Sequence, residues 1–136
     1  MSPSMYREFV LPYVSKLSSL FGYVYYGCCE PLHDRIPYIK EAFHNLKSVS
    51  VSAWSDKRIL AEELGGSYVY SYKPLPSYMS GQSPNWDAQQ KELDDVQKAA
   101  RDNGCKLEII LRDVYDVGGN IGNFKSWAEM AKARLL

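Results

Sequence analysis

The chain has little cysteine, no excess charge of either sign and no long apolar run, and each shortage excludes a class of protein. Three cysteines among 136 residues, with Cys28 and Cys29 adjacent, do not make the disulfide framework of a small secreted domain. The 16 basic and 16 acidic residues cancel without a basic tract or an acidic tail, which disfavours nucleic acid and anionic membranes as partners. No stretch approaches the roughly 18 apolar residues of a membrane span, and the first residues lack a signal-peptide pattern. We therefore expect a reduced, cytoplasmic protein with no nucleic-acid or membrane partner.

Helix and strand patterns alternate along the chain. Helices are expected at 4–20, 34–45, 57–64, from 85 or 87 to 104, and at 123–135, and strands at 23–28, 48–53, 67–72 and 106–112. The first helix carries one apolar stripe, and Pro12 should kink or split it. Asp34, Asp56 and Asn123 are expected to cap later helices. A helix follows each strand, which predicts a parallel sheet with right-handed crossovers.

The predicted strands have one aliphatic face and one mixed face. The aliphatic face contains Val49, Val51, Leu107, Ile109 and Leu111, whereas the other mixes serine, tyrosine and charge. Barrel strands have this pattern, with the aliphatic side toward the helices and the mixed side toward the pore. We predict one α/β domain over residues 1–136, with four parallel βα units preceded by one helix, which is half of a TIM-type (β/α)8 barrel. Four strands cannot close such a barrel, so a second half-barrel is expected, either in a homodimer or as a missing N-terminal half.

The first predicted strand runs directly into a group of reactive side chains. Cys28, Cys29, Glu30 and His33 follow its tyrosines. In parallel α/β sheets, ligands and catalytic groups lie just past the carboxyl ends of the strands. The sequence therefore predicts a functional site at this strand end, and strand alternation favours Cys28 over Cys29 as its thiol.

Two further candidates follow the next two strands. Asp56 is expected to be a helix N-cap with a second role in the pore, and Lys73 to be an anion-binding cation. Each candidate also has a plain structural interpretation. The two cysteines fit a crowded, buried strand end, Glu30 and Lys73 fit solvated loop positions, and His33 fits a bridging position within its loop.

Four segments of the chain resemble a known superfamily. They read YREFVLPY at 6–13, YGCCE at 26–30, SVSAWSD at 50–56 and YKPLP at 72–76. In this order they resemble the C-terminal half of uroporphyrinogen-decarboxylase-like proteins, a superfamily that includes the cobalamin-dependent methyltransferases. The resemblance implies a (β/α)8 barrel, a small methylated substrate, a corrinoid-bound methyl group and a corrinoid protein as a partner.

The resemblance also implies a zinc site, which departs here from the family pattern. Family methyltransferases bind zinc through a His-x-Cys at one strand end and a second Cys at the last, because zinc holds a thiol as its thiolate. Cys28 matches the first Cys, but Tyr26 stands at the His position, and the last strand ends without a cysteine. A rearranged zinc site would therefore use Cys28 or its neighbour, Glu30, His33 and Asp113.

Three hypotheses about function follow. The first is a methyltransferase-like enzyme, active with a second half-barrel, whose catalytic candidates are Cys28, Glu30, Asp56 and Lys73. The second is a non-catalytic half-barrel module for binding or assembly. The third, a tetrapyrrole decarboxylase fragment, ranks lower, because the family's porphyrinogen-binding arginines and central aspartate lie in the absent half. The histidine expected near the last strand is also lacking, since none follows His44.

Overall fold

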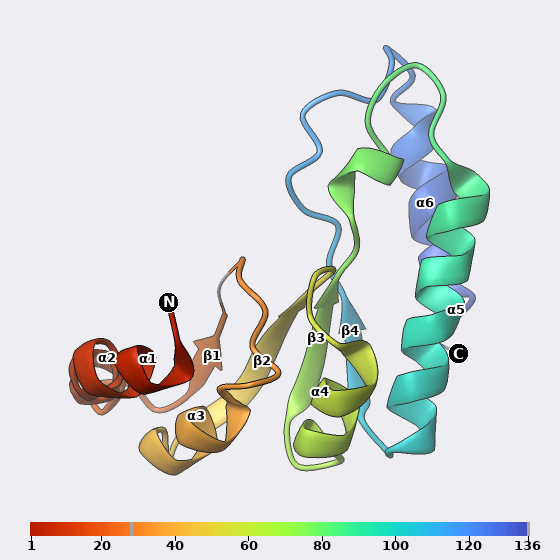
Figure 1. Ribbon diagram of the computed structural model, residues 1–136. Helices are drawn as coiled ribbons and strands as arrows, with labels where there is room; N and C mark the ends of the chain where they lie inside the picture. Colours follow the sequence, from red (N-terminus) through yellow and green to blue (C-terminus); the bar gives the residue numbers. More distant parts are fainter. Residues whose placement is uncertain (28, 136) are drawn as a thin grey trace.

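Four parallel strands form one sheet in the computed structural model, which describes residues 1–27 and 29–135. The strands are β1 (Val24–Tyr26), β2 (Leu46–Ser52), β3 (Val69–Lys73) and β4 (Lys106–Ile109). They lie side by side in the order β1-β2-β3-β4, so β1 and β4 form the two edges of the sheet (Figure 1). The α/β class and the parallel pairing predicted from the sequence are confirmed.

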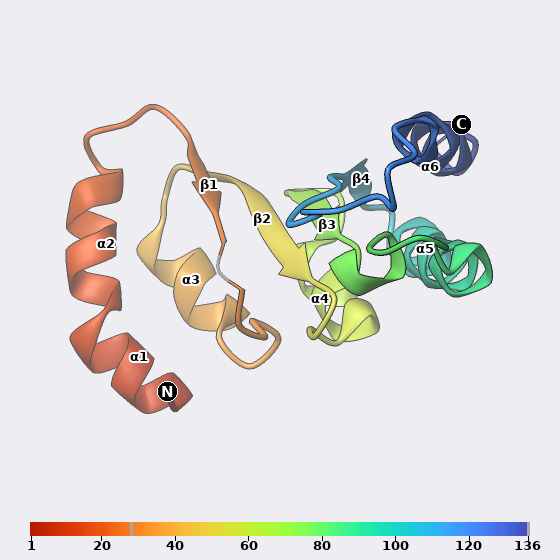
Figure 2. The same ribbon diagram turned by 90° about the horizontal axis from the view of Figure 1, so that it is seen from above.

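Helical segments precede, connect and follow these strands. They are α1 (Pro3–Phe9), α2 (Leu11–Ser18), α3 (Ile36–Ala42), α4 (Lys57–Leu64), the 3-10 turn η1 (Pro76–Tyr78), α5 (Trp86–Asp102) and α6 (Gly122–Lys132). Of these, α3, α4 and α5 are the helices that link one strand to the next. Figure 2 shows the strands along an arc, with α3, α4 and α5 outside it and with α1 and α2 beyond β1. In the described part of the chain, no helix covers the inner side of the arc between β1 and β4.

The first predicted helix is split in two, as Pro12 requires. The α1 helix ends at Phe9, and α2 begins at Leu11, so Pro12 lies in the first turn of a new helix. Proline is tolerated there because the first N–H groups of a helix have no intrahelical partner.

The apolar stripe of this helix pair is largely uncovered. Phe9 and Leu17 are each 58% exposed, and Tyr13 and Leu20 are more exposed still. The contacts with the core are made instead by Tyr6 and by residues on another side of the helices. We call Phe9, Tyr13 and Leu17 the exposed stripe.

The hydrophobic core lies between the helices and the side of the sheet that faces them. Val49 and Val51 are fully buried there, and the register places Tyr70 and Tyr72 beside them on the same face. The aliphatic face was predicted correctly, but the prediction placed tyrosine on the opposite face, which is wrong for these two residues. Burial raises the pKa of both phenols, as expected for tyrosines that serve as core side chains.

Two of the predicted helix caps are wrong. The α3 helix begins after Arg35 without a side-chain cap, because Asp34 forms an ion pair with Arg35 instead. The α6 helix begins one residue before Asn123, whose side-chain amide donates to the Val117 carbonyl. In each position a nearby polar partner competes with the helix N-terminus for the short side chain. The Asp56 cap of α4 is confirmed.

Candidate functional site

Polar side chains gather on the inner side of the sheet. Tyr25 of β1, Ser50 of β2, Ser71 and Lys73 of β3, and Glu108 of β4 share this side, which we call the polar sheet face. Because the β2 side chains there are small serines, Tyr25 reaches across β2 and its hydroxyl lies 3.0 Å from Ser71 Oγ on β3. The sequence expectation of a mixed inner face is therefore met by one connected set of side chains.

A pocket of about 400 Å³ opens on this face at the carboxyl ends of the strands. Its lining residues are Tyr25, Gly27, Cys29, Ser50, Lys73 and Arg112. We call it the Tyr25 pocket. Parallel strands all present their carboxyl ends at the same edge, and functional groups of barrel enzymes lie at that edge.

Two cations and a phenol dominate the chemistry of the pocket. Lys73 Nζ donates to Ser50 Oγ at 2.6 Å and lies 5.0 Å from the centre of the Tyr25 ring. Arg112 pairs with Asp113 and places its Nη2 3.1 Å from the Cys29 sulfur, a contact that raises the pKa of Arg112 further. The pocket therefore offers positive charge to an anionic group of a ligand.

The phenol of Tyr25 is easier to ionise than an ordinary tyrosine. Partial burial alone would raise its pKa, but hydrogen bonds with Lys73, Ser71 and Ser50 and the charge of Lys73 together outweigh this effect. The net result is a lowered pKa for Tyr25.

A buried carboxylate holds Lys73 in place from the helix side. Glu92 of α5 accepts a hydrogen bond of 2.6 Å from the Tyr72 hydroxyl and one of 3.2 Å from the Leu75 amide. Lys73 lies between these two anchored residues. The last residue of β3 is thus positioned by a contact on the opposite face of the sheet.

The structure reverses one expectation about the first strand end. Tyr26 packs on Phe43 at a ring-centre distance of 5.2 Å, and its hydroxyl contacts that of Tyr6, so it faces the helices. The pocket side is taken by Tyr25, Gly27 and Cys29. Its place at the His position of the family's zinc site would put Tyr26 on the pore side, which is wrong, and Cys29 lines the pocket instead. The main thiol candidate, Cys28, lies outside the described residues.

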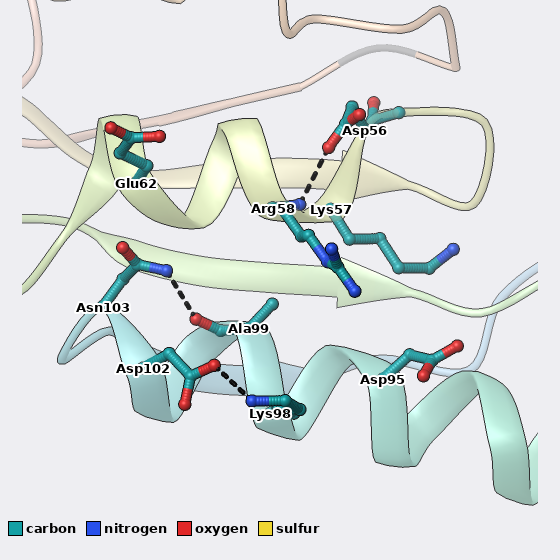
Figure 3. A pocket seen from close by; sticks show the side chains of 10 residues that line it. Asp56, Lys57, Arg58, Glu62, Asp95, Lys98, Ala99, Asp102 and Asn103 are labelled. Carbon is teal, nitrogen blue, oxygen red and sulfur yellow. Dashed lines mark hydrogen bonds and ion pairs between the residues drawn. The ribbon is translucent and has the colours of Figure 1, made fainter.

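Four other predicted residues, Glu30, His33, Asp56 and Lys73, lie in three separate places. Glu30 pairs with Arg35 at 2.7 Å, which lowers the pKa of the Glu30 carboxyl. His33 Nδ1 accepts from the Asp56 backbone amide at 3.3 Å, so these two are brought together. The Asp56 side chain lines a separate hollow of about 690 Å³ between α4 and α5, on the outer side of the sheet (Figure 3). Lys73 alone among these four lines the Tyr25 pocket.

No metal site is preformed in the part of the chain that the structure describes, and the predicted ligand Cys28 lies outside that part. Across residues 1–27 and 29–135, no group of three or more His, Cys, Asp or Glu side chains is placed to hold a metal ion. Glu30 and Asp113 each pair with an arginine instead. We therefore derive no chemistry through a metal from this structure.

Sequence reasoning missed Tyr25, Ser50, Ser71, Glu108 and Arg112. The signal for Tyr25 was present, because strand alternation places it on the same side as Cys29. Arg112 had only its position after the last strand as a signal. The contact between Arg112 and Cys29 joins residues 83 positions apart, and no local pattern predicts such a pair.

Comparison of the chain with known proteins finds no relative. No family model matches the chain, and neither the curated proteins nor the solved structures contain a significant match. Within the described residues, none of the helices is long and apolar enough to span a membrane.

Replacing Asp56 by alanine should destabilise the protein in a pH-dependent way. Asp56 accepts hydrogen bonds from the Ile59 and Arg58 amides at 3.0 Å, and chiefly the Ile59 bond lowers its pKa. The stabilisation is thus complete above the ordinary pKa of aspartate and disappears as pH falls through the lowered pKa of the folded state. We expect a loss of about 1 kcal/mol at neutral pH, measured by urea unfolding, that shrinks in acid.

Asp56→Ser is the matched control, because a serine hydroxyl caps without carrying charge. It should stay close to the wild type at neutral pH. A deficit of Asp56→Ala that is equally large in acid and at neutral pH would contradict the charged cap.

Proposed function

We propose that this chain is one half of a (β/α)8 barrel and that its polar sheet face forms one wall of a small-molecule active site. The position of the Tyr25 pocket carries this proposal. The pocket lies at the carboxyl ends of parallel strands, on the face that no described helix covers. In a closed barrel that face is the pore and that end carries the active site.

The two open edges and the exposed stripe support closure by a second half-barrel. A two-fold axis along the barrel would place β4 of each chain beside β1 of the other, with all strands parallel. The exposed stripe lies beyond β1, where it would cover part of the partner. A second copy of the chain fits this role, and an N-terminal half of the same barrel would fit it in the same way.

For the reaction, we propose an enzyme related to the corrinoid-dependent methyltransferases of the uroporphyrinogen-decarboxylase superfamily. The resemblance of the four sequence segments supports this choice, together with a pocket that offers Lys73 and Arg112 to an anionic group. Zinc and a corrinoid protein stay predictions of that resemblance. A tetrapyrrole decarboxylase fragment ranks lower, because the resemblance implies a histidine near the end of the last strand and none follows His44.

A non-catalytic half-barrel module is the second candidate. The observation that favours it is the pairing of the predicted ligands Glu30 and Asp113 with arginines. Such a chain would have kept the scaffold and the binding face without the zinc chemistry of its family.

Light scattering of the purified chain tests the half-barrel proposal. We expect a dimer at micromolar concentration, because a lone half-barrel leaves two strand edges and the polar sheet face uncovered. The double variant Phe9→Glu/Leu17→Glu should shift the mass to that of a monomer, since it places two charges on the exposed stripe.

Ile121→Glu is the matched control, because Ile121 is an exposed apolar residue outside the exposed stripe. It should leave the dimer intact. A wild-type chain that is folded and monomeric at these concentrations would contradict the proposal.

A further inference from the structure

A chain of hydrogen bonds leads from the Tyr25 pocket to a carboxylate. The Ser71 hydroxyl donates its one hydrogen to Glu108 Oε2, so toward Tyr25 it can only accept. The Tyr25 hydroxyl, 3.0 Å away, is therefore the donor in that pair. Hydrogen bonds are thus donated from the Tyr25 phenol to the Ser71 hydroxyl and from that hydroxyl to the Glu108 carboxylate. A proton can leave Tyr25 along such an arrangement.

The nearest charge to Tyr25, that of Lys73, favours its ionised form. The charged groups that face the pocket are the Lys73 ammonium, the Arg112 guanidinium and, behind Ser71, the Glu108 carboxylate. Lys73 lies closest to the Tyr25 ring, with Nζ 5.0 Å from its centre. An ammonium over the ring favours the negative charge of a phenolate, and the lowered pKa of Tyr25, to which a hydrogen bond with Lys73 and the charge of Lys73 contribute, agrees with that geometry.

We propose that Tyr25 is the proton-transfer residue of the Tyr25 pocket, with Lys73 stabilising its phenolate and with Ser71 and Glu108 relaying its proton. The phenol O–H bond breaks as its proton passes to Ser71, while the Ser71 proton passes to Glu108. The phenolate oxygen then takes a proton from the substrate. The substrate has thus lost one proton, Glu108 has gained one, and the reverse sequence makes Tyr25 an acid.

This chemistry selects a class of substrate. Proton transfer is most efficient between groups of similar pKa, so a phenol or an enol suits a tyrosine better than a simple alcohol. Tyr25 is 47% exposed at the pocket, which leaves its ring accessible to such a molecule. The inference rests on the proposed function in one respect, namely that the Tyr25 pocket is part of an active site.

Ultraviolet titration of phenolate absorbance in the full chain tests the proposal. Among the eleven tyrosines, Tyr25 should ionise at the lowest pH, so Tyr25→Phe should remove the first transition. Lys73→Met should move that transition to higher pH. Tyr115→Phe is the control, because Tyr115 is 92% exposed, and it should leave the first transition in place. A first transition that survives in Tyr25→Phe would overturn the proposal.

A labelling experiment tests the same proposal on the wild-type chain, so its result does not depend on whether a variant folds. N-acetylimidazole acetylates ionised phenols, and peptide mapping by mass spectrometry identifies the site. At a pH below the ordinary tyrosine range, Tyr25 should react before Tyr115 although Tyr115 is more exposed. Labelling of Tyr115 first would overturn the proposal. Light scattering on the same sample distinguishes failure of this proposal from failure of the half-barrel proposal. If the chain is a monomer and Tyr25 still reacts first, only the half-barrel proposal is contradicted.

Discussion

Replacing Glu92 by alanine is expected to lower the free energy of unfolding by about 3 kcal/mol, because two hydrogen bonds to a charged acceptor are lost. Glu92 is only 9% exposed and accepts from the Tyr72 hydroxyl and the Leu75 amide. Tyr72 is fully buried, so its hydroxyl would be left without an acceptor inside the core. Urea unfolding followed by circular dichroism measures the loss.

Two control variants separate the effect of losing the hydrogen-bond acceptor from the effect of changing a residue of α5. Glu92→Gln keeps an oxygen that can accept, so its loss should be clearly smaller. Asp95→Ala changes an exposed acidic residue on the same helix and should leave stability nearly unchanged. Equal losses for the alanine and glutamine variants would contradict the role assigned to the two hydrogen bonds.

Replacing Gly27 by alanine is expected to cost about 1–3 kcal/mol, the usual range for overpacking. An added Cβ would lie 2.2 Å from the Ser50 Cβ, because the chain after β1 runs directly against β2. One of the two must move, and Ser50 is the hydrogen-bond partner of Lys73. We therefore expect the variant both to unfold at lower urea concentration and to lose the early ionisation of Tyr25.

Gly22→Ala is the matched control, since a Cβ at Gly22 meets nothing within 4 Å. It adds the same methyl group just before the same strand. If both variants had equal stability, the close approach of Gly27 to Ser50 would not limit the packing of β1.

The sequence anticipated the scaffold better than the site. Of the residues that line the Tyr25 pocket, Lys73 was a candidate because it follows a predicted strand, whereas Cys29 was named only as an alternative to the favoured Cys28. Tyr25 and Ser50 looked like ordinary strand residues. Their role comes from contacts such as that between Tyr25 and Ser71, which are 46 positions apart.

The face of each strand was the weakest part of the prediction. Alternation separates Tyr25 from Tyr26 correctly, but alternation alone does not say which of the two faces the helices. The contacts of Tyr26 with Phe43 and Tyr6 decide this, and both partners lie on helices or just after one. The same ambiguity led to the wrong placement of Tyr70 and Tyr72.

By itself, the sequence determined the order of helices and strands, the break before Pro12, the cap at Asp56 and the position of reactive residues after strands. These are local properties, set by backbone preferences and by hydrogen bonds within a few residues. Only the tertiary structure decided that Tyr25, Lys73 and Arg112 share one pocket. The physical reason is that strand register and helix placement are set by packing between distant segments, which brings side chains from three separate strand ends to one edge of the sheet.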